Sequence, residues 1–522
     1  MRQVWLYCGT ILAFGLLLAY AVEPSPVVSQ TSTARVAKVV GMASCSSSGC
    51  HGASLEYRDG QDSVPLQDRR LEPATWKNAA SWWVKHDPHT KAYADLSSAL
   101  SAQIVARLNP ETDKPKPAWE RARCLACHST PQSVYAVGTT EPDLTEPTTR
   151  LRAEGVSCDA CHTQPGRATD DWQRAHTAPQ YRAESYEKLG MRSINTLADR
   201  ATMCAGCHVG APADPKAGIP ARNMNHDMIA AGHPRLNWDY ATYSDALPPH
   251  WQEYDRSDRT TKTGGRGNDW DLRTWLEGEV YSTAAALELT ADRSGGPAAN
   301  DPARPWPELA ESNCFACHHS LVPESWRRRE NGGYDAMKVR FPDIKPGSNL
   351  WLSTAYSLPL QKLTAKDADL TAKYKAFFAL MSSRYPNPAK VRTQAAELRT
   401  ALLRWATTEG PKIGEKALRE ALDAASGEKY LPWDECVQIY NATRPVLLMR
   451  AADGSKPTAS IARWKQLGGL LELPRQAGEN WNSPRMRRLE GDGIENEFDK
   501  EFETGKDVRE SMKALFDGLK AK

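Results

Sequence analysis

The chain has 522 residues and a mass of 57.8 kDa, which is enough for about two to four domains. Its formal net charge is only +2, from 66 basic and 64 acidic residues, so the composition gives no reason to expect a nucleic-acid partner. A mean hydropathy of −0.59 excludes a protein with many membrane spans.

The first 22 residues contain an apolar run, from Val4 to Val22, that follows Arg2. A cleaved signal peptide, with Ala19-Tyr20-Ala21 as its small-x-small site, and an uncleaved inner-membrane anchor are both compatible with this length. Either alternative exports the remaining chain. Cys8 lies inside the run, where we interpret it as a buried or discarded cysteine. Residues 23–44, rich in Ser, Thr, Pro and Val, read as a linker.

Residues 45–335 contain five close cysteine pairs, each followed by a histidine. Four pairs have the form C-x-x-C-H, as CLACH, CDACH, CAGCH and CFACH, and the first has the wider form CSSSGCH. This is the attachment signature of c-type haem. The predicted thioether-forming residues are Cys45, Cys50, Cys124, Cys127, Cys158, Cys161, Cys204, Cys207, Cys314 and Cys317.

The spacing suits haem because two thioethers fix one edge of the porphyrin and the next residue reaches the iron as its proximal ligand. The predicted proximal ligands are His51, His128, His162, His208 and His318. Structural zinc sites and disulfides also use close cysteine pairs, and a disulfide is the alternative for Cys45 and Cys50. Neither requires a histidine after the second cysteine. Because His makes up 12 of the 522 residues, five such histidines would arise by chance roughly once in 10⁸ cases.

Seven histidines remain beyond the motifs, and all twelve lie between His51 and His319. Five irons with two imidazoles each would need five of these seven. A single histidine is usually only a polar surface residue. Their confinement to the motif region nevertheless indicates that most of them serve iron.

Residues 336–522 contain no cysteine pair and no histidine, and we predict an all-helical region of unknown role. Val391, Ala395, Leu398, Leu402 and Trp405 recur at helical spacing on one face. In residues 412–425 and 507–519 apolar residues also recur at helical spacing. Pro386, Gly410 and Gly427 mark the expected ends of these helices. The predicted fold class is therefore mainly α with extensive coil, a multihaem cytochrome c core followed by this helical region.

Three stretches give the chain a resemblance to the tetrahaem cytochrome c-554 family and its larger multihaem relatives. HDPHTKAYADL is similar to the segment after the family's first haem, GVSCDACHTQPGRAT resembles its third haem motif, and CAGCH follows at a similar spacing. Thr163 departs from the glycine of the family's third motif. The resemblance covers about residues 41–210, and NHDMIAAGHPRLNWDY is similar to a segment of longer bacterial members.

The resemblance implies a helical and coiled fold with haems packed closely in pairs. It also implies that His176 is the distal ligand of the His51 iron and His89 that of the His162 iron, whereas the His128 iron would be five-coordinate. The candidates for the irons of His208 and His318 are His226, His233 and His250. We expect His86 and His319 not to bind iron.

The function that these observations favour is an exported, periplasmic electron carrier with mostly bis-His haems. Its expected cofactors are five covalent haems c. Its expected partners are redox proteins, either other cytochromes or a quinol- or hydroxylamine-oxidising enzyme. The alternative is a haem oxidoreductase acting on hydroxylamine, nitric oxide or nitrite at one open iron, whose catalytic residues the sequence does not identify. No C-x-x-C-K motif is present, and a zinc protein is a third, weaker alternative.

Overall fold

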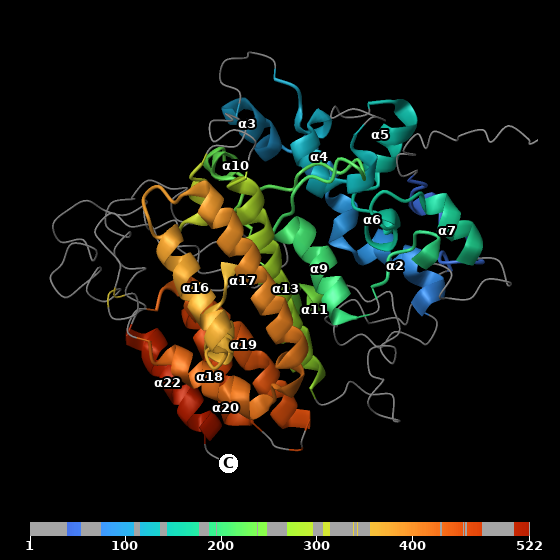
Figure 1. The fold of residues 1–522 in the computed structure, drawn as a ribbon. Helices are drawn as coiled ribbons and strands as arrows, with labels where there is room; N and C mark the ends of the chain where they lie inside the picture. Colours follow the sequence, from blue (N-terminus) through green and yellow to red (C-terminus); the bar gives the residue numbers. More distant parts are fainter. Residues whose placement is uncertain are drawn as a thin grey trace, which may run out of the picture. The chain divides into compact units, whose positions relative to one another are not determined.

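The computed structural model describes residues 39–53, 75–108, 115–135, 144–176, 187–194, 196–236, 238–247, 269–295, 306–313, 338, 342, 355–428, 431–452, 454, 457–471 and 506–520. In these residues the fold is mainly α, and strand pairing is limited to isolated bridges. The helices are α2 (Ala79–His86), α3 (Ala99–Leu108), α4 (Ala122–His128), α5 (Glu146–Ala153), α6 (Cys158–His162), α7 (Thr169–His176), α9 (Leu197–His208), α10 (His226–Ala230), α11 (Tyr240–Ala246), α13 (Trp270–Arg293), α15 (Leu358–Thr364), α16 (Ala368–Met381), α17 (Pro388–Thr408), α18 (Glu415–Ser426), α19 (Trp433–Ala452), α20 (Thr458–Leu470) and α22 (Lys506–Lys520) (Figure 1).

The C-terminal helices follow the periodicity of the sequence. In α17 all five residues predicted to share a face are buried. The side chain of Asn387 caps this helix by accepting a hydrogen bond from the backbone of Lys390, and Pro388 occupies its first turn. Helices α18 and α22 occupy the other two segments that the periodicity predicted. The prediction of a helical C-terminal region is confirmed for the described residues.

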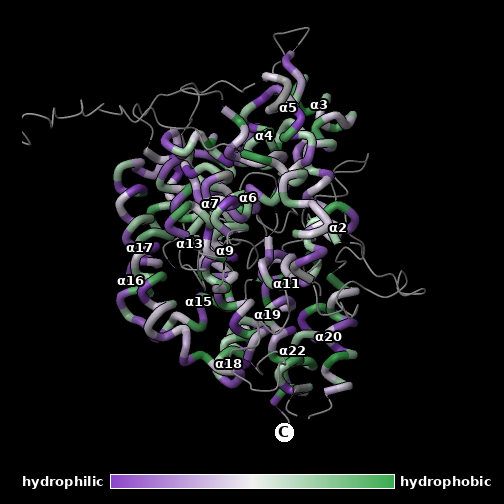
Figure 2. The backbone as a smooth tube through the Cα atoms, turned by 90° about the vertical axis from the view of Figure 1, so that its right-hand side faces the viewer, coloured by the Kyte–Doolittle hydropathy of each residue, from purple (hydrophilic) through white to green (hydrophobic). Residues whose placement is uncertain are grey.

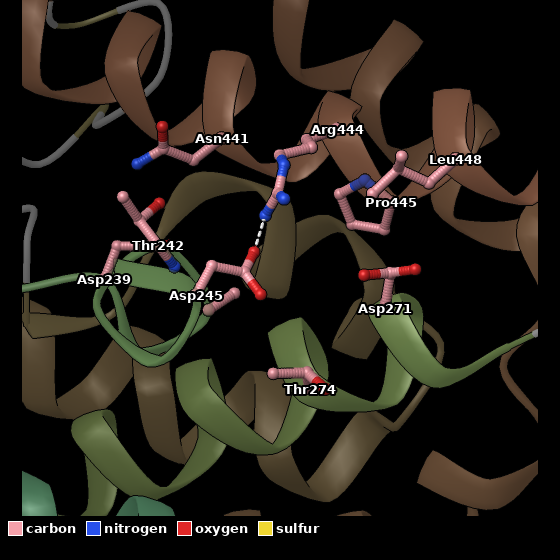
Figure 3. A pocket seen from close by; sticks show the side chains of 10 residues that line it. Asp239, Thr242, Asp245, Asp271, Thr274, Asn441, Arg444, Pro445 and Leu448 are labelled. Atoms are coloured by element: carbon pink, nitrogen blue, oxygen red, sulfur yellow. Dashed lines mark hydrogen bonds and ion pairs between the residues drawn. The ribbon is translucent and has the colours of Figure 1, made fainter. Parts of the chain in front are cut away.

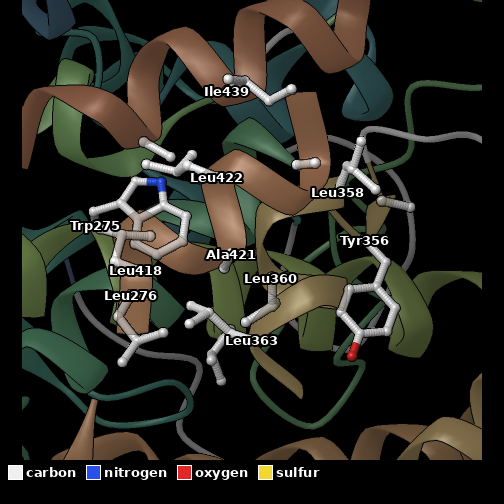
Figure 4. Close-up of a cluster of buried hydrophobic side chains, with 14 of the residues drawn as sticks. Trp275, Leu276, Tyr356, Leu358, Leu360, Leu363, Leu418, Ala421, Leu422 and Ile439 are labelled. Atoms are coloured by element: carbon white, nitrogen blue, oxygen red, sulfur yellow. The ribbon is translucent and has the colours of Figure 1, made fainter. Parts of the chain in front are cut away.

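One hydrophobic cluster joins these helices into a common core. It takes buried side chains from α13, α15 to α20 and α22, among them Trp275, Leu360, Leu422 and Ile439 (Figure 4). Along α18 and α22 hydrophobic and hydrophilic residues alternate, as Figure 2 shows, because each helix turns one face towards the core. Burial of this apolar surface is the main term that stabilises the region.

Helix α13 connects this core to the cysteine motifs. The sequence predicts only short helices between Cys45 and His319, but α13 has 24 residues. It packs against α17 and α19 in the C-terminal core and also against α9 and α11 (Figure 1). Contacts on opposite sides bury several faces, so its apolar residues form no single stripe at helical spacing. Gly278 permits the close approach of α11, because a Cβ there would lie 2.7 Å from Cβ of Tyr240.

A buried ion pair holds the end of α13 to two other segments. Nη1 of Arg293 lies 2.5 Å from Oε1 of Glu311, and both side chains are more than nine-tenths buried. Nε of Arg293 also donates to the side-chain oxygen of Asn223 at 3.0 Å, and Thr290 donates to Glu311 at 2.7 Å. The network therefore ties residues 223–224 and 308–313 to the helix that shares the C-terminal core.

No helix within the described ranges has the length and apolar character needed to span a bilayer. The apolar run of residues 4–22, the linker up to residue 38 and Cys8 lie outside the described residues, as do Cys314, Cys317, His318, His319 and His250.

We predict that Glu311→Ala lowers the free energy of unfolding by about 3–5 kcal/mol, because it leaves the Arg293 charge buried without its partner. The matched control is Glu288→Ala on the same helix, which removes a half-exposed partner of Arg399 and should cost about 1 kcal/mol or less. Chemical denaturation of both variants measures the difference. Equal losses would contradict a stabilising role for the Arg293 network.

Candidate functional site

In three of the four motifs that the structure describes, the cysteines and the histidine form the last turn of a helix. CLACH ends α4 at His128, CDACH forms α6 and ends at His162, and CAGCH ends α9 at His208. Residues at positions i, i+3 and i+4 lie on one helix face. Both sulfurs and the imidazole of each motif therefore project from the same side, as attachment to one porphyrin requires.

The first motif is not helical, and hydrogen bonds hold it against the third. The backbone N–H of His51 donates to the carbonyl of Cys45 at 3.2 Å, which closes the wider loop. The buried carboxylate of Asp159, inside CDACH, accepts hydrogen bonds from the backbone N–H groups of Gly41 at 3.0 Å and Val40 at 3.4 Å. Glu154 accepts another from Met42 at 2.7 Å. The segment that leads into Cys45 is thus fixed by the residues around Cys158.

Thiol contacts show which motifs are neighbours. A hydrogen bond joins Cys45 to Cys158, lowering the pKa of the first thiol and raising that of the second. Another joins Cys127 to Cys207, raising the pKa of Cys127 and lowering that of Cys207 to about 6. Burial raises the pKa of Cys204 to about 12, and the nearby Cys161 adds to this effect. The first motif therefore adjoins the third, the third adjoins the fourth, and the fourth adjoins the second.

Three pairs of histidine rings lie close together, with nearly the same separation between their ring centroids. The ring centroids of His51 and His176 are 6.2 Å apart, with the planes 7° from parallel. Those of His89 and His208 are 6.1 Å apart at 81°, and those of His128 and His233 are 6.3 Å apart at 79°. Each pair joins the histidine of a cysteine motif to a histidine outside the motifs.

This separation fits a single iron atom between two imidazoles. With metal–nitrogen bonds of about 2.0 Å on both sides, the two ring centroids would lie roughly 6.3 Å apart. The described residues contain no group of three or more His, Cys, Asp or Glu side chains arranged to hold a metal ion. A haem iron needs only two protein ligands, because the porphyrin supplies the other four.

Hydrogen bonds orient four of these six rings. The Nδ1–H groups of His128, His176 and His233 donate to the carbonyls of Ala92, Gln173 and Pro234 at 2.7, 2.8 and 2.8 Å. Nδ1–H of His89 donates to the buried carboxylate of Asp87 at 2.8 Å. A proton held on Nδ1 leaves the lone pair on Nε2, which is the form of imidazole that binds a metal.

Burial also favours neutral imidazole at two of these positions. It lowers the pKa of His208 to about 3, and the nearby His89 contributes in the same direction. It lowers the pKa of His233, although the Pro234 carbonyl acts in the opposite direction. At His89 burial lowers the pKa, but Asp87 outweighs it and the net shift is upward. Neutral rings are ready to coordinate a metal without first losing a proton.

The pairings differ in part from those that the resemblance implied. The resemblance paired His176 with His51, gave His89 to the His162 iron and left the His128 iron open; in the structure His176 lies beside His51, His89 lies beside His208 and His233 approaches His128. The reason is long-range packing. Arg107 on α3 donates to the carbonyl of Ala231 at 3.1 Å, and Arg123 on α4 donates to Asn225 at 3.2 Å.

These two hydrogen bonds draw the His233 segment onto the helices around the second motif. The His89 segment is fixed separately, because its carbonyl accepts a hydrogen bond from Val156 at 3.1 Å. The positive φ of Gly155 permits this approach, since a Cβ there would lie 2.3 Å from that carbonyl.

The other sequence-predicted histidines are placed as follows. His86, expected not to bind iron, lies against Trp82 with ring centroids 4.5 Å apart. His226 begins α10, and its backbone N–H donates to Glu308 at 2.9 Å. The carbonyl of His162 accepts a hydrogen bond from Arg192 at 2.8 Å. His250, Cys314, Cys317 and His318 lie outside the described residues.

Sequence reasoning missed several side chains around these histidines. Asp87 orients His89, and its place directly before Pro88 in HDPH is the signal that could have revealed it as a cap. Trp238 stacks on His208, with ring centroids 4.2 Å apart, and no periodicity marks it. Arg222 lies 4.0 Å from the sulfur of Cys207, and its buried Nε has no hydrogen-bond partner.

Residues 76–163 match the protein family described as cytochrome c554 and c-prime. The match includes CLACH and CDACH, together with His86 and His89. It supports a c-type cytochrome, in which covalently attached haem carries electrons. The chain matches no curated protein and no solved structure.

We predict that Asp159→Ala loosens the first motif from the third. The variant removes an acceptor from the N–H groups of Gly41 and Val40, and a hydrogen bond to a charged group contributes about 1.5–3 kcal/mol. Hydrogen exchange in residues 39–53 should accelerate by about tenfold or more. The peptide spanning α20 is the internal control. Unchanged exchange at residues 39–53 would show that Asp159 does not hold this segment.

Proposed function

We propose that this protein is an exported multihaem c-type cytochrome that transfers electrons through closely packed haems, most of them held by two histidines. The observation that carries the proposal is the set of three histidine pairs, each formed by one motif histidine and one histidine outside the motifs. In each pair the ring centroids are separated by the distance that one iron atom bound between two imidazoles requires. The match of residues 76–163 to a cytochrome family supports it.

When bound, haem supplies one-electron redox chemistry at its iron. The cysteines of the motifs would hold it by thioether bonds, and the histidines would bind its iron. The proposed ligand pairs are His51 with His176, His128 with His233, and His208 with His89. Two protein ligands leave no position for a substrate, which favours a carrier over an enzyme. His226 and His250 remain candidates for the other irons, including that of His318.

The thiol contacts support an order for the electron path. Electrons would pass between the motifs of Cys45 and Cys158, then to that of Cys204, and then to that of Cys127. Neighbouring sulfurs imply neighbouring porphyrin edges, and short edge distances favour rapid transfer. The motif that contains Cys314 would hold a fifth haem.

Compartment and partners follow from the same chemistry. The apolar run of residues 4–22 supports export to the periplasmic side, as a soluble or anchored protein, and haem c is attached outside the cytoplasm. The partners would be other redox proteins that donate and accept electrons.

The alternative is an oxidoreductase acting on hydroxylamine, nitric oxide or nitrite at a five-coordinate iron. The resemblance assigns that role to the iron of His128. A second imidazole 6.3 Å from the His128 ring fits an occupied position there, so we prefer the carrier.

We predict that the mature protein carries five covalent haems, because five motifs are present. Intact-protein mass spectrometry measures the number. Replacing Cys45 and Cys50 together by Ser should remove one haem and leave the others attached. A double variant with the same haem content as the parent would show that the wider CSSSGCH motif does not bind haem.

We predict that His176→Ala converts one haem from low spin to high spin and creates one binding site for carbon monoxide. Loss of the second imidazole weakens the ligand field of that iron. Electron paramagnetic resonance and carbon monoxide titration measure both effects. His86→Ala is the control, since His86 packs on Trp82 and should leave every spin state unchanged. If His176→Ala stays fully low-spin, the proposed pairing with His51 is wrong.

A further inference from the structure

The segment that carries His233 is attached to the C-terminal helices by a buried ion pair. Nη2 of Arg235 lies 3.0 Å from Oδ1 of Asp434, in the first turn of α19, and only 12% and 8% of these side chains are exposed. The two residues are 199 positions apart in sequence. The contact thus joins the motif region to the helical region whose role the sequence left open.

The link from Arg235 to His233 is short and stiff. Only Pro234 separates them, and a proline ring restricts the backbone angle φ. The carbonyl of Pro234 also accepts the hydrogen bond from Nδ1 of His233 at 2.8 Å. A displacement of Arg235 would therefore move both the backbone of His233 and the acceptor that orients its ring.

Other contacts hold the same stretch at its two ends. On the N-terminal side, Arg107 of α3 donates to the carbonyl of Ala231 at 3.1 Å. On the C-terminal side, Arg444 of α19 forms an ion pair with Asp245 of α11, shown as the dashed line in Figure 3. Helix α19 thus contacts the stretch at Arg235 and again at Asp245. Its position depends on the C-terminal core, because α19 packs on α13, α15 and α18.

We propose that Asp434 is a positioning residue for the distal haem ligand His233, and that the C-terminal helices thereby control whether the His128 iron has six ligands or five. This inference rests on the proposed function, specifically on the pairing of His128 with His233. On this inference the C-terminal helices keep His233 in place as the second protein ligand of the His128 iron. Removing the Asp434 carboxylate breaks the buried ion pair that holds Arg235 to α19, so Arg235 and, through Pro234, His233 would shift.

The test compares three variants of the full-length, haem-loaded protein by electron paramagnetic resonance and carbon monoxide titration. His233→Ala defines the signal of an open His128 iron. Asp434→Ala should produce the same high-spin signal, with carbon monoxide binding at that haem raised at least tenfold over the parent. Asp434→Glu, which keeps the charge, should restore most of the low-spin form. Mass spectrometry should find equal haem content in all variants.

A stability-matched control separates positioning from general loosening. Leu422→Ala opens a cavity in the same core, at a side chain that is 0% exposed, without touching the ion pair. It should lower the denaturation midpoint while every haem stays low-spin. If Asp434→Ala fails to fold, Asp434→Asn, which keeps the shape and removes the charge, takes its place.

The outcomes distinguish the two proposals. A high-spin signal in His233→Ala but not in Asp434→Ala overturns the positioning role and leaves the cytochrome proposal standing. Equal high-spin signals in Asp434→Ala and Leu422→Ala also overturn it, because the effect would then follow stability alone. A fully low-spin His233→Ala overturns the pairing of His128 with His233 and this inference with it.

Discussion

The haem ligation that we propose for this protein depends on the orientation of histidine rings. An imidazole binds a metal through the nitrogen that lacks a proton, and the hydrogen bond made by the other nitrogen decides which one that is. In four rings a fixed acceptor holds Nδ1–H: the carboxylate of Asp87 or the carbonyls of Ala92, Gln173 and Pro234. Three of these acceptors belong to the backbone. The orientation of these rings therefore depends on the backbone conformation as much as on the identity of neighbouring side chains.

The cysteine motifs could be predicted from the sequence because each lies within a few consecutive residues. A cysteine pair followed by a histidine is recognisable in five residues, and the same spacing places all three groups on one face of a single helical turn. The buried face of α17 is equally readable, since the apolar residues from Val391 to Trp405 recur with the helical period. Neither feature needs knowledge of a distant segment.

The pairing of histidines could not be read in this way. His128 and His233 meet because Arg107 and Arg123 hold a segment more than one hundred residues away, and no pattern near either histidine records that contact. Helix α13 was not predicted from the sequence for a related reason. It is buried against α9 on one side and α17 on the other, which removes the single apolar stripe that identifies a surface helix. Long-range packing decides both features. The resemblance to the cytochrome c-554 family covers only about residues 41–210, so it gives no information about the helical core that follows.

The position of α13 has a consequence for the topology of the whole chain. Helix α13 belongs to the same hydrophobic core as α15 and the helices that follow it, although Cys314 and Cys317 lie between α13 and α15 in the sequence. The core therefore takes helices from both sides of the fifth cysteine motif in the sequence. Cutting the chain between α13 and α15 would separate helices that share this core, so residues 336–522 alone do not contain the whole of it.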